Sequence, residues 1–356
     1  MPENLNLCAF DEKIKLAKAL FSDFKGEFEC FSSPLKCYRT RAELSFFRDE
    51  QGLHFAMFDA KSKHKFIIKR FEIAVLPIQN AMSALLDELN SRPTLAFKLF
   101  GAEFLATKDD LSITLLYHTD INSLKNELCA LQKRLKIHLI ARSKGKKLVF
   151  GDENLLQRLN INGQEFLYEF NNDCFVQPNT AINEKMIKWA LDKIATQERA
   201  DLCELYCGYG NFTLPLSRLF RRVLATEISK TNTHFARLNA AANKTHNTSF
   251  VRLSSSELAE ALSGVREFYR LKELNINLSE FNFSHIFIDP PRAGLDESVR
   301  AFVAEFGHII YISCNPQSLR RDLNTLLKTH KILHFALFDQ FATTEHLECG
   351  VILGKI

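Results

Sequence analysis

Strands and helices alternate along the second half of this 356-residue chain, and this alternation limits the possible fold more than any other feature. Short apolar stretches typical of buried strands are separated by segments with the period of amphipathic helices. Such alternation predicts an α/β domain with a doubly wound, parallel sheet. The strands are expected at residues 202–205, 222–226, 249–253, 285–288 and 308–312, and the helices at 181–195, 212–220, 230–244, 297–305 and 316–328. Two last strands, at 332–338 and 347–353, predict an antiparallel edge hairpin.

The first part of the chain has a pattern typical of an α+β module. Residues 36–70 contain more basic than acidic side chains, and residues 132–147 contain no acid. A basic surface suits a polyanionic partner, although solvated lysines on an ordinary surface would give the same composition. The pattern changes after residue 165, so we predict two domains, at residues 1–165 and 166–356.

Composition is that of an ordinary globular protein, with 46% hydrophobic and 25% charged residues and a net charge of +4. The nine cysteines include no C-x-x-C pair, which disfavours both a zinc site and a disulfide framework. No basic leader precedes an apolar segment at the N-terminus, and no apolar run is long enough to span a bilayer. We therefore expect a cytoplasmic protein without a metal site, a membrane contact or an obligate protein partner.

A turn with two glycines follows the first of the alternating strands. Residues 202–212 lead from an apolar strand through Gly208 and Gly210 into a predicted helix. Glycines allow a close approach of the backbone to a ligand, and the start of the helix presents free N–H groups. The next strand ends in Glu227, whose carboxylate can accept hydrogen bonds from ribose hydroxyls. The dinucleotide fingerprint requires a third glycine where this chain has Thr213, so the adenosine of S-adenosylmethionine (SAM) fits at least as well. An ordinary turn beside an acid is the alternative.

Three reactive side chains lie near the ends of later strands. Asp289 ends an apolar strand and should face the ligand side of the sheet. Cys314 lies between a strand and a helix, where the helix dipole lowers a thiol pKa, so we predict a nucleophile that attacks a nucleic-acid base. Glu348 opens an apolar run, where a carboxylate needs either a function or a cationic partner. The alternatives are a small core cysteine and a glutamate paired with an arginine such as Arg292.

Together these motifs resemble one family, the tRNA uracil-5-methyltransferases of the TrmA type. The resemblance covers nearly the whole chain and rests on residues 38–43, 175–179, 204–212, 225–227, 289–295, 311–316, 336–341 and 346–350. It implies a C-terminal Rossmann-like class I SAM-dependent methyltransferase domain with an N-terminal α+β RNA-binding domain. The implied activity is methylation of C5 of uridine 54 in the T loop of tRNA, with tmRNA as a further candidate substrate.

The resemblance also assigns roles to individual residues. It implies that Cys314 attacks C6 of uracil and that Glu348 is the general base. His346 lies two residues before Glu348 on the same strand face, so it could orient the site and is a weaker candidate for the base. The positions that correspond to the SAM site are Gln177, Tyr206, Gly208, Asn211, Glu227 and Asp289.

Contacts with RNA are predicted for a smaller set of residues. Arg39, Arg41 and Arg292 could bind phosphate, and Phe100 could stack in the RNA loop, although a place in the core is the more frequent role for a phenylalanine. Related ribosomal-RNA uracil methyltransferases carry a four-cysteine iron–sulfur cluster. Only Cys30 and Cys37 lie in the corresponding region here, so we expect no cluster.

The sequence is also compatible with three alternative functions. The chain could methylate uracil C5 in ribosomal RNA, or it could fold tRNA as a chaperone beside its catalytic activity. An adenine N6-methyltransferase also places an acid or amide before two prolines, but it normally has an aromatic residue where this chain has Arg292.

Overall fold

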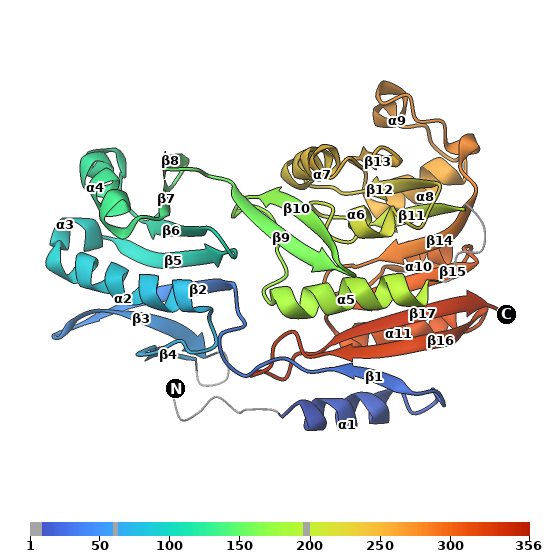
Figure 1. Cartoon of the computed structure of the whole chain (residues 1–356), viewed down its shortest axis with the longest axis horizontal. Coiled ribbons are helices and arrows are strands. Elements are labelled where there is room, and N and C mark those ends of the chain that lie inside the picture. Colours follow the sequence, from blue (N-terminus) through green and yellow to red (C-terminus); the bar gives the residue numbers. More distant parts are fainter. Residues whose placement is uncertain (1–8, 60–62, 195–199) are drawn as a thin grey trace. The chain divides into compact units, whose positions relative to one another are not determined.

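Two compact units make up the computed structural model, which describes residues 9–59, 63–194 and 200–356 (Figure 1). Within these residues, the first unit consists of Pro34–Arg158 and Glu169–Thr180, and the second of residues 9–33, Leu159–Tyr168 and Ala181–Ile356. This division differs from the single predicted boundary at residue 165. The N-terminal segment belongs to the second unit because it pairs with strands near the C-terminus, and sequence periodicity does not reveal such distant pairing.

The first unit is built on a seven-stranded sheet in the order β4-β3-β2-β5-β6-β7-β8. Its strands are β2 (Arg41–Asp49), β3 (Gly52–Asp59), β4 (His64–Ile67), β5 (Leu99–Ala106), β6 (Leu111–Tyr117), β7 (His138–Ser143) and β8 (Lys146–Phe150). All neighbours are antiparallel except β6 and β7, which are parallel and are joined through helix α4 (Lys125–Leu135). Helix α2 (Leu76–Ser91) buries Ile78, Leu85 and Leu89 in the core of this unit, and the short α3 (Pro93–Ala96) follows it.

The second unit contains an eight-stranded sheet in the order β1-β16-β17-β15-β14-β11-β12-β13. Its strands are β1 (Phe28–Phe31), β11 (Asp201–Leu205), β12 (Arg222–Thr226), β13 (Thr248–Val251), β14 (Phe283–Ile288), β15 (His308–Ser313), β16 (His330–Phe338) and β17 (Glu348–Lys355). Every neighbouring pair is parallel except those made by β17, and β11 is buried along its whole length, as expected for a strand covered on both faces. The alternating pattern therefore predicted the parallel part of this sheet correctly.

The helices of this unit come largely from the predicted segments. They are α1 (Phe10–Leu20), α5 (Thr180–Lys193), α6 (Thr213–Leu216), α7 (Lys230–Ala242), α8 (Ser255–Leu262), α9 (Tyr269–Glu273), α10 (Glu297–Val303) and α11 (Pro316–Leu326). The helix predicted at 212–220 is only one turn long, and α8 and α9 were not predicted. Two further strands, β9 (Leu155–Ile161) and β10 (Gln164–Phe170), form a small separate sheet.

The last two strands are antiparallel, as predicted, but they do not form the edge of the sheet. Strand β17 lies between β15 and β16, and β1 pairs in parallel with the outer side of β16. Figure 1 shows β1 beside the two red strands at the end of the chain. The predicted edge hairpin was therefore wrong in its position, because β1 comes from the opposite end of the sequence. A second correction concerns residues 175–179, whose sequence predicts a short strand that ends in a turn. Phe175 and Val176 are not in a strand.

Candidate active site

A strained turn follows β11 and precedes the one-turn helix α6. Tyr206, Gly208 and Gly210 all have positive φ angles, of 60°, 56° and 92°. A tyrosine rarely adopts this conformation, and such strain is common at ligand sites. A Cβ atom at Gly208 would meet no other atom within 4 Å, so the backbone at this glycine is open on its outer side.

The carboxylate of Glu227 is fixed beside this turn. Its Oε2 accepts a hydrogen bond from the backbone N–H of Gly208 at 3.0 Å, and its Oε1 accepts one from the N–H of Ser229 at 2.7 Å. Each carboxylate oxygen can accept more than one hydrogen bond, so capacity remains for hydroxyl donors. The first of these bonds holds Glu227 at the glycine turn, and its predicted contact with ribose hydroxyls stays a prediction.

The side chain of Asn211 is occupied by a neighbour from α5. Its amide group exchanges two hydrogen bonds of 2.8 Å with the amide group of Asn183, and both residues are buried. Asn183 was missed in the sequence because an asparagine within a helix carries no local signal. The predicted contact of Asn211 with the cofactor stays a prediction, and so does that of Gln177, which is buried in the first unit.

Cys314 lies in the link between β15 and α11. Helix α11 begins with Pro316, and the side chain of Asn315 caps it by accepting a hydrogen bond from the N–H of Gln317 at 3.1 Å. Ser313 pairs with Cys349 in the antiparallel ladder between β15 and β17. One further step along this register places Cys314 opposite Glu348, the first residue of β17. The fold thus brings the two predicted catalytic residues together.

A cavity of about 280 Å³ opens beside Cys314. Its lining includes Arg292, His346 and Gln317, together with Lys13 from the N-terminal helix α1. Lys13 is buried and forms an ion pair of 2.7 Å with Asp339, so the start of the chain contributes to this part of the site. This contribution was not predicted, because α1 was assigned to the other domain.

Burial dominates the electrostatics of the thiol. It raises the pKa of Cys314 to about 12, and the nearby carboxyl groups of Glu348 and Asp289 act in the same direction. Arg292 lowers the pKa, but by less. The expected lowering of the thiol pKa by the helix was therefore wrong, because desolvation and two acids outweigh the helix terminus.

Buried acids form a second electrostatic feature of the site. Burial raises the pKa of Asp289 to about 7 and holds that of Glu348 well above its usual range, with the charge of Asp289 adding to the effect on Glu348. Burial also raises the pKa of Glu204 in β11 to about 8, and Asp289 contributes there too. Several neighbouring acids with raised pKa values are typical of active sites. Glu204 was not among the predicted site residues, although it is the second-last residue of the apolar strand β11.

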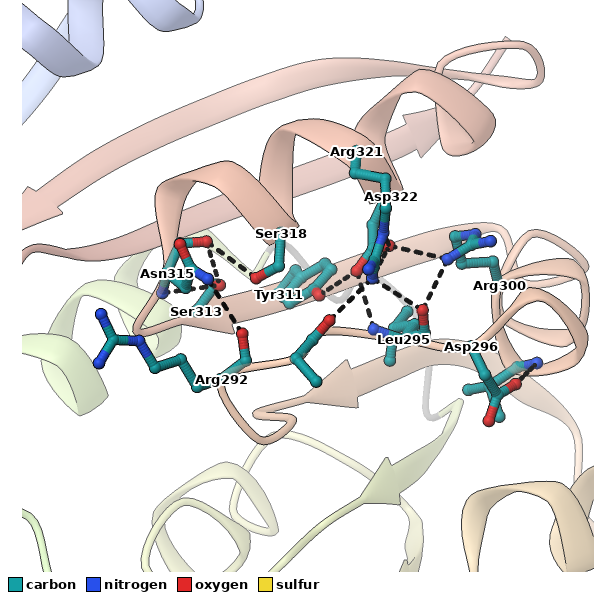
Figure 2. A network of polar contacts seen from close by, with 12 residues as sticks. Arg292, Leu295, Asp296, Arg300, Tyr311, Ser313, Asn315, Ser318, Arg321 and Asp322 are labelled. Carbon is teal, nitrogen blue, oxygen red and sulfur yellow. Dashed lines mark hydrogen bonds and ion pairs between the residues drawn. The ribbon is translucent and has the colours of Figure 1, made fainter.

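A network around Asp322 fixes the loop that carries Asp289 and Arg292 (Figure 2). The fully buried carboxylate of Asp322 accepts hydrogen bonds from the Tyr311 hydroxyl at 2.7 Å and from the N–H of Leu295 at 2.9 Å. The guanidinium groups of Arg300 and Arg321 pair with the same carboxylate.

The loop is also tied at the start of α11. The Asn315 side chain donates a hydrogen bond to the carbonyl of Arg292 at 3.1 Å. Gly294 has a φ of 75°, and a Cβ atom there would lie 2.6 Å from Asp322 Oδ2, so only glycine fits. The loop after β14 is therefore held against the segment that carries Cys314.

The predicted RNA contacts of the first unit lie on or near its surface. Arg41 pairs with Glu43 at 3.1 Å, and the Nε of Arg39 donates a hydrogen bond to the carbonyl of Arg41 at 2.7 Å. Phe100 is 40% exposed and stacks on His118 with ring centroids 4.0 Å apart. The core interpretation of Phe100 was wrong, and its exposed ring agrees with a stacking role.

The family model described as tRNA (Uracil-5-)-methyltransferase matches residues 6–356. The chain belongs to this family. Within the described ranges, no group of three or more His, Cys, Asp or Glu side chains is placed to hold a metal ion. In the same residues, no helix is both long and apolar enough to cross a membrane.

Individual relatives agree with the family assignment. The tRNA/tmRNA (uracil-C(5))-methyltransferase of Campylobacter lari is 57% identical over 346 residues, which cover 97% of this chain and 98% of the relative. The protein of the same name from Acinetobacter baylyi is 42% identical and covers 97% of both chains.

Among solved structures, the chain is similar to the Pyrococcus abyssi tRNA (uracil-54, C5)-methyltransferase in complex with S-adenosyl-L-homocysteine. The TM-score is 0.73 at 18% identity, over 97% of this chain and 82% of that chain. This likeness shows that the chain has the fold of a methyltransferase of known structure.

Proposed function

We propose that this protein transfers a methyl group from SAM to C5 of uridine 54 in the T loop of tRNA, through a temporary bond between Cys314 and C6 of the uracil. The register of β15 and β17, which sets Cys314 opposite Glu348 beside a cavity, is the observation that carries this proposal. Family membership supports the choice of tRNA over ribosomal RNA. The names of the relatives support tmRNA as a second substrate.

The turn after β11 suits the adenosine part of SAM. The open backbone at Gly208 allows a close approach, and the oriented carboxylate of Glu227 can accept hydrogen bonds from ribose hydroxyls. Tyr206, Asn211 and Asp289 are proposed to complete the cofactor site in the second unit, and the contact of Gln177 with SAM stays a prediction. When bound, SAM supplies an electrophilic methyl group.

Cys314 supplies the nucleophile, because C5 of uracil is too weak a nucleophile to take a methyl group directly. The Cys314 thiolate forms a bond to C6, and the electron pair of the C5–C6 double bond moves toward C5 and O4. The enolate-like C5 can then take the methyl group. The raised pKa of Cys314 keeps the resting thiol protonated, so its proton must pass to solvent or to a nearby carboxylate before the sulfur attacks.

Glu348 removes the proton that C5 still carries after methylation. A general base must lie within hydrogen-bond reach of that proton. Glu348 is near enough to Cys314 for its charge to raise the pKa of the thiol, so it is the proposed base. The electrons of the C5–H bond restore the C5–C6 double bond, and the S–C6 bond breaks. The thiolate of Cys314 is thereby regenerated. A raised pKa makes Glu348 a strong proton acceptor once it is ionised.

The target base must leave its stack to reach a cysteine beside a cavity. Extrusion costs a few kcal/mol and is easiest in a loop, which suits the T loop of tRNA. Arg39 and Arg41 are proposed to contact phosphates, and Phe100 is proposed to stack on a base. Arg292 lines the cavity beside Cys314 and is proposed to contact the RNA backbone there.

Methyl transfer to an unmodified tRNA transcript tests this function. The wild-type protein should convert one uridine of the T loop to 5-methyluridine, whereas Cys314→Ala should lose at least about 10³-fold in rate and still bind tRNA. Cys30→Ala, which removes an exposed thiol, is the matched control and should retain full activity. Retained turnover in Cys314→Ala would contradict the covalent mechanism, and methylation of ribosomal RNA in place of tRNA would contradict the substrate.

A further inference from the structure

A second cavity, larger than the one beside Cys314, lies at the β13 edge of the sheet in the second unit. It has a volume of about 450 Å³ and is lined by residues of α7, the end of β13 and α9. Four of its lining side chains are cations, namely Lys230, Arg237, Arg252 and Arg270, and Glu273 is the one acid that lines it. The cavity thus carries an excess of three positive charges. None of these cations has a role in the proposed reaction or in the proposed SAM site.

The cations of this basic cavity have no acidic partners among the described residues. Arg237 donates a hydrogen bond to the carbonyl of Phe250 at 2.8 Å, and Arg270 donates one to the carbonyl of Arg252 at 2.8 Å. These bonds fix both guanidinium groups against the edge strand β13 and leave their other N–H donors for a ligand. The side chains of Lys230 and Arg252 form no hydrogen bond or ion pair with any described residue. Fixed and unpaired cations in one hollow favour an anion of high charge density.

The position of the basic cavity relates it to the reaction. Lys230 is the first residue of α7, which follows the end of β12, and Arg252 directly follows β13. Both therefore lie at the carboxyl edge of the parallel strands, as Cys314 does at the end of β15. Four strand spacings separate β13 from β15, which corresponds to ~19 Å. A folded RNA that presents one loop to Cys314 is large enough to cover both places.

We propose that the basic cavity binds phosphodiester groups of the RNA substrate, at a place distinct from the loop that is methylated. This inference rests on the proposed function, because it assumes that the polyanion bound at this edge is the tRNA. The cavity contributes affinity and orientation, not chemistry, since none of its cations has been placed at the reacting atoms. Its loss should therefore raise KM for tRNA and leave kcat unchanged.

The test removes two cations that support no other contact. Lys230→Gln/Arg252→Gln should weaken binding of full-length tRNA on the order of tenfold near 0.1 M salt and lower the slope of log Kd against log salt by roughly 1.5 to 2. The matched control is Lys328→Gln/Lys331→Gln, which removes the same charge from exposed positions just before and within the start of β16, the strand next to the opposite edge of the sheet. The control pair should leave affinity and salt slope close to wild type. Thermal unfolding and SAM binding should be unchanged in both double variants.

The outcomes separate this proposal from the proposed function. If the wild type methylates tRNA and the cavity variant has wild-type affinity and salt slope, the phosphate site is contradicted while the enzyme assignment stands. An equal loss of affinity in the control pair would also contradict it, because net charge alone would then explain the effect. A wild-type protein that does not methylate tRNA would instead contradict the proposed function.

Discussion

At the scale of single residues, the proposed reaction depends on the protonation of three buried side chains in the active site. Burial raises the pKa values of Cys314, Asp289 and Glu348, so the protonated form of each is favoured more than it would be in a solvated side chain. Burial therefore has two opposite effects on the reaction. It makes the thiolate of Cys314 and the carboxylate of Glu348 strongly reactive once they form, but it also lowers the fraction of each group that is ionised.

Glu348→Gln should trap the covalent complex. A glutamine has nearly the same shape but cannot take the C5 proton, so the S–C6 bond should persist after methyl transfer. Denaturing gel electrophoresis with labelled tRNA should reveal a protein–RNA adduct that accumulates in this variant and is absent from Cys314→Ala/Glu348→Gln. If Glu348→Gln forms no adduct and turns over normally, Glu348 is not the base.

The rate of methyl transfer, measured as kcat/KM, should rise with pH. Attack requires the deprotonated thiol, and the pKa of Cys314 is raised to about 12, so the thiolate fraction grows with each pH unit across the neutral range. A plot of log kcat/KM against pH should therefore increase with a slope of up to about one between pH 6.5 and 8.5.

Arg292 provides a check on the sign of this pH dependence. Its charge lowers the pKa of Cys314, so Arg292→Gln should displace the same profile to higher pH. A profile that falls with pH in the wild type, or one displaced to lower pH in the variant, would contradict the electrostatic account.

At the scale of elements, the Asp322 network joins α11, β15 and the loop after β14. Asp322→Asn preserves the size of the side chain but leaves Arg300 and Arg321 without their buried carboxylate. We expect a loss of roughly 3 kcal/mol in the free energy of unfolding, measured by urea denaturation, because a broken buried ion pair leaves an uncompensated charge. Asp192→Asn, which breaks an exposed pair with Lys188, should cost about 0.5 kcal/mol or less. Equal midpoints for the two variants would mean that the network does not stabilise the loop.

Much of the site could be predicted at this scale because each residue lies at a strand end with a recognisable local pattern. Glycines mark the turn after β11, and the prolines after Asp289 and Cys314 mark the ends of β14 and β15. What could not be predicted depends on contacts between distant segments. The thiol pKa was expected to be low because the helix start is visible in the sequence, whereas the acids that surround Cys314 come from other strands.

At the scale of the whole molecule, the largest difference between the predicted and the observed organisation concerns the N-terminal segment. Residues 9–33 supply β1 to the catalytic sheet and Lys13 to the cavity beside Cys314, although the sequence placed them with the first domain. Local periodicity identifies a helix and says nothing of its partner sheet. The parallel pairing of strands β11 to β15 could be predicted, because α/β alternation restricts the topology.

The central claim is that this protein makes 5-methyluridine in tRNA through Cys314. Mass spectrometry of nucleosides from purified tRNA tests it most directly, in cells that lack the protein and in the same cells supplied with the wild type or Cys314→Ala. We predict that 5-methyluridine is lost without the protein, returns with the wild type and stays absent with Cys314→Ala. Persistence of 5-methyluridine without the protein, or its return with Cys314→Ala, would contradict the account.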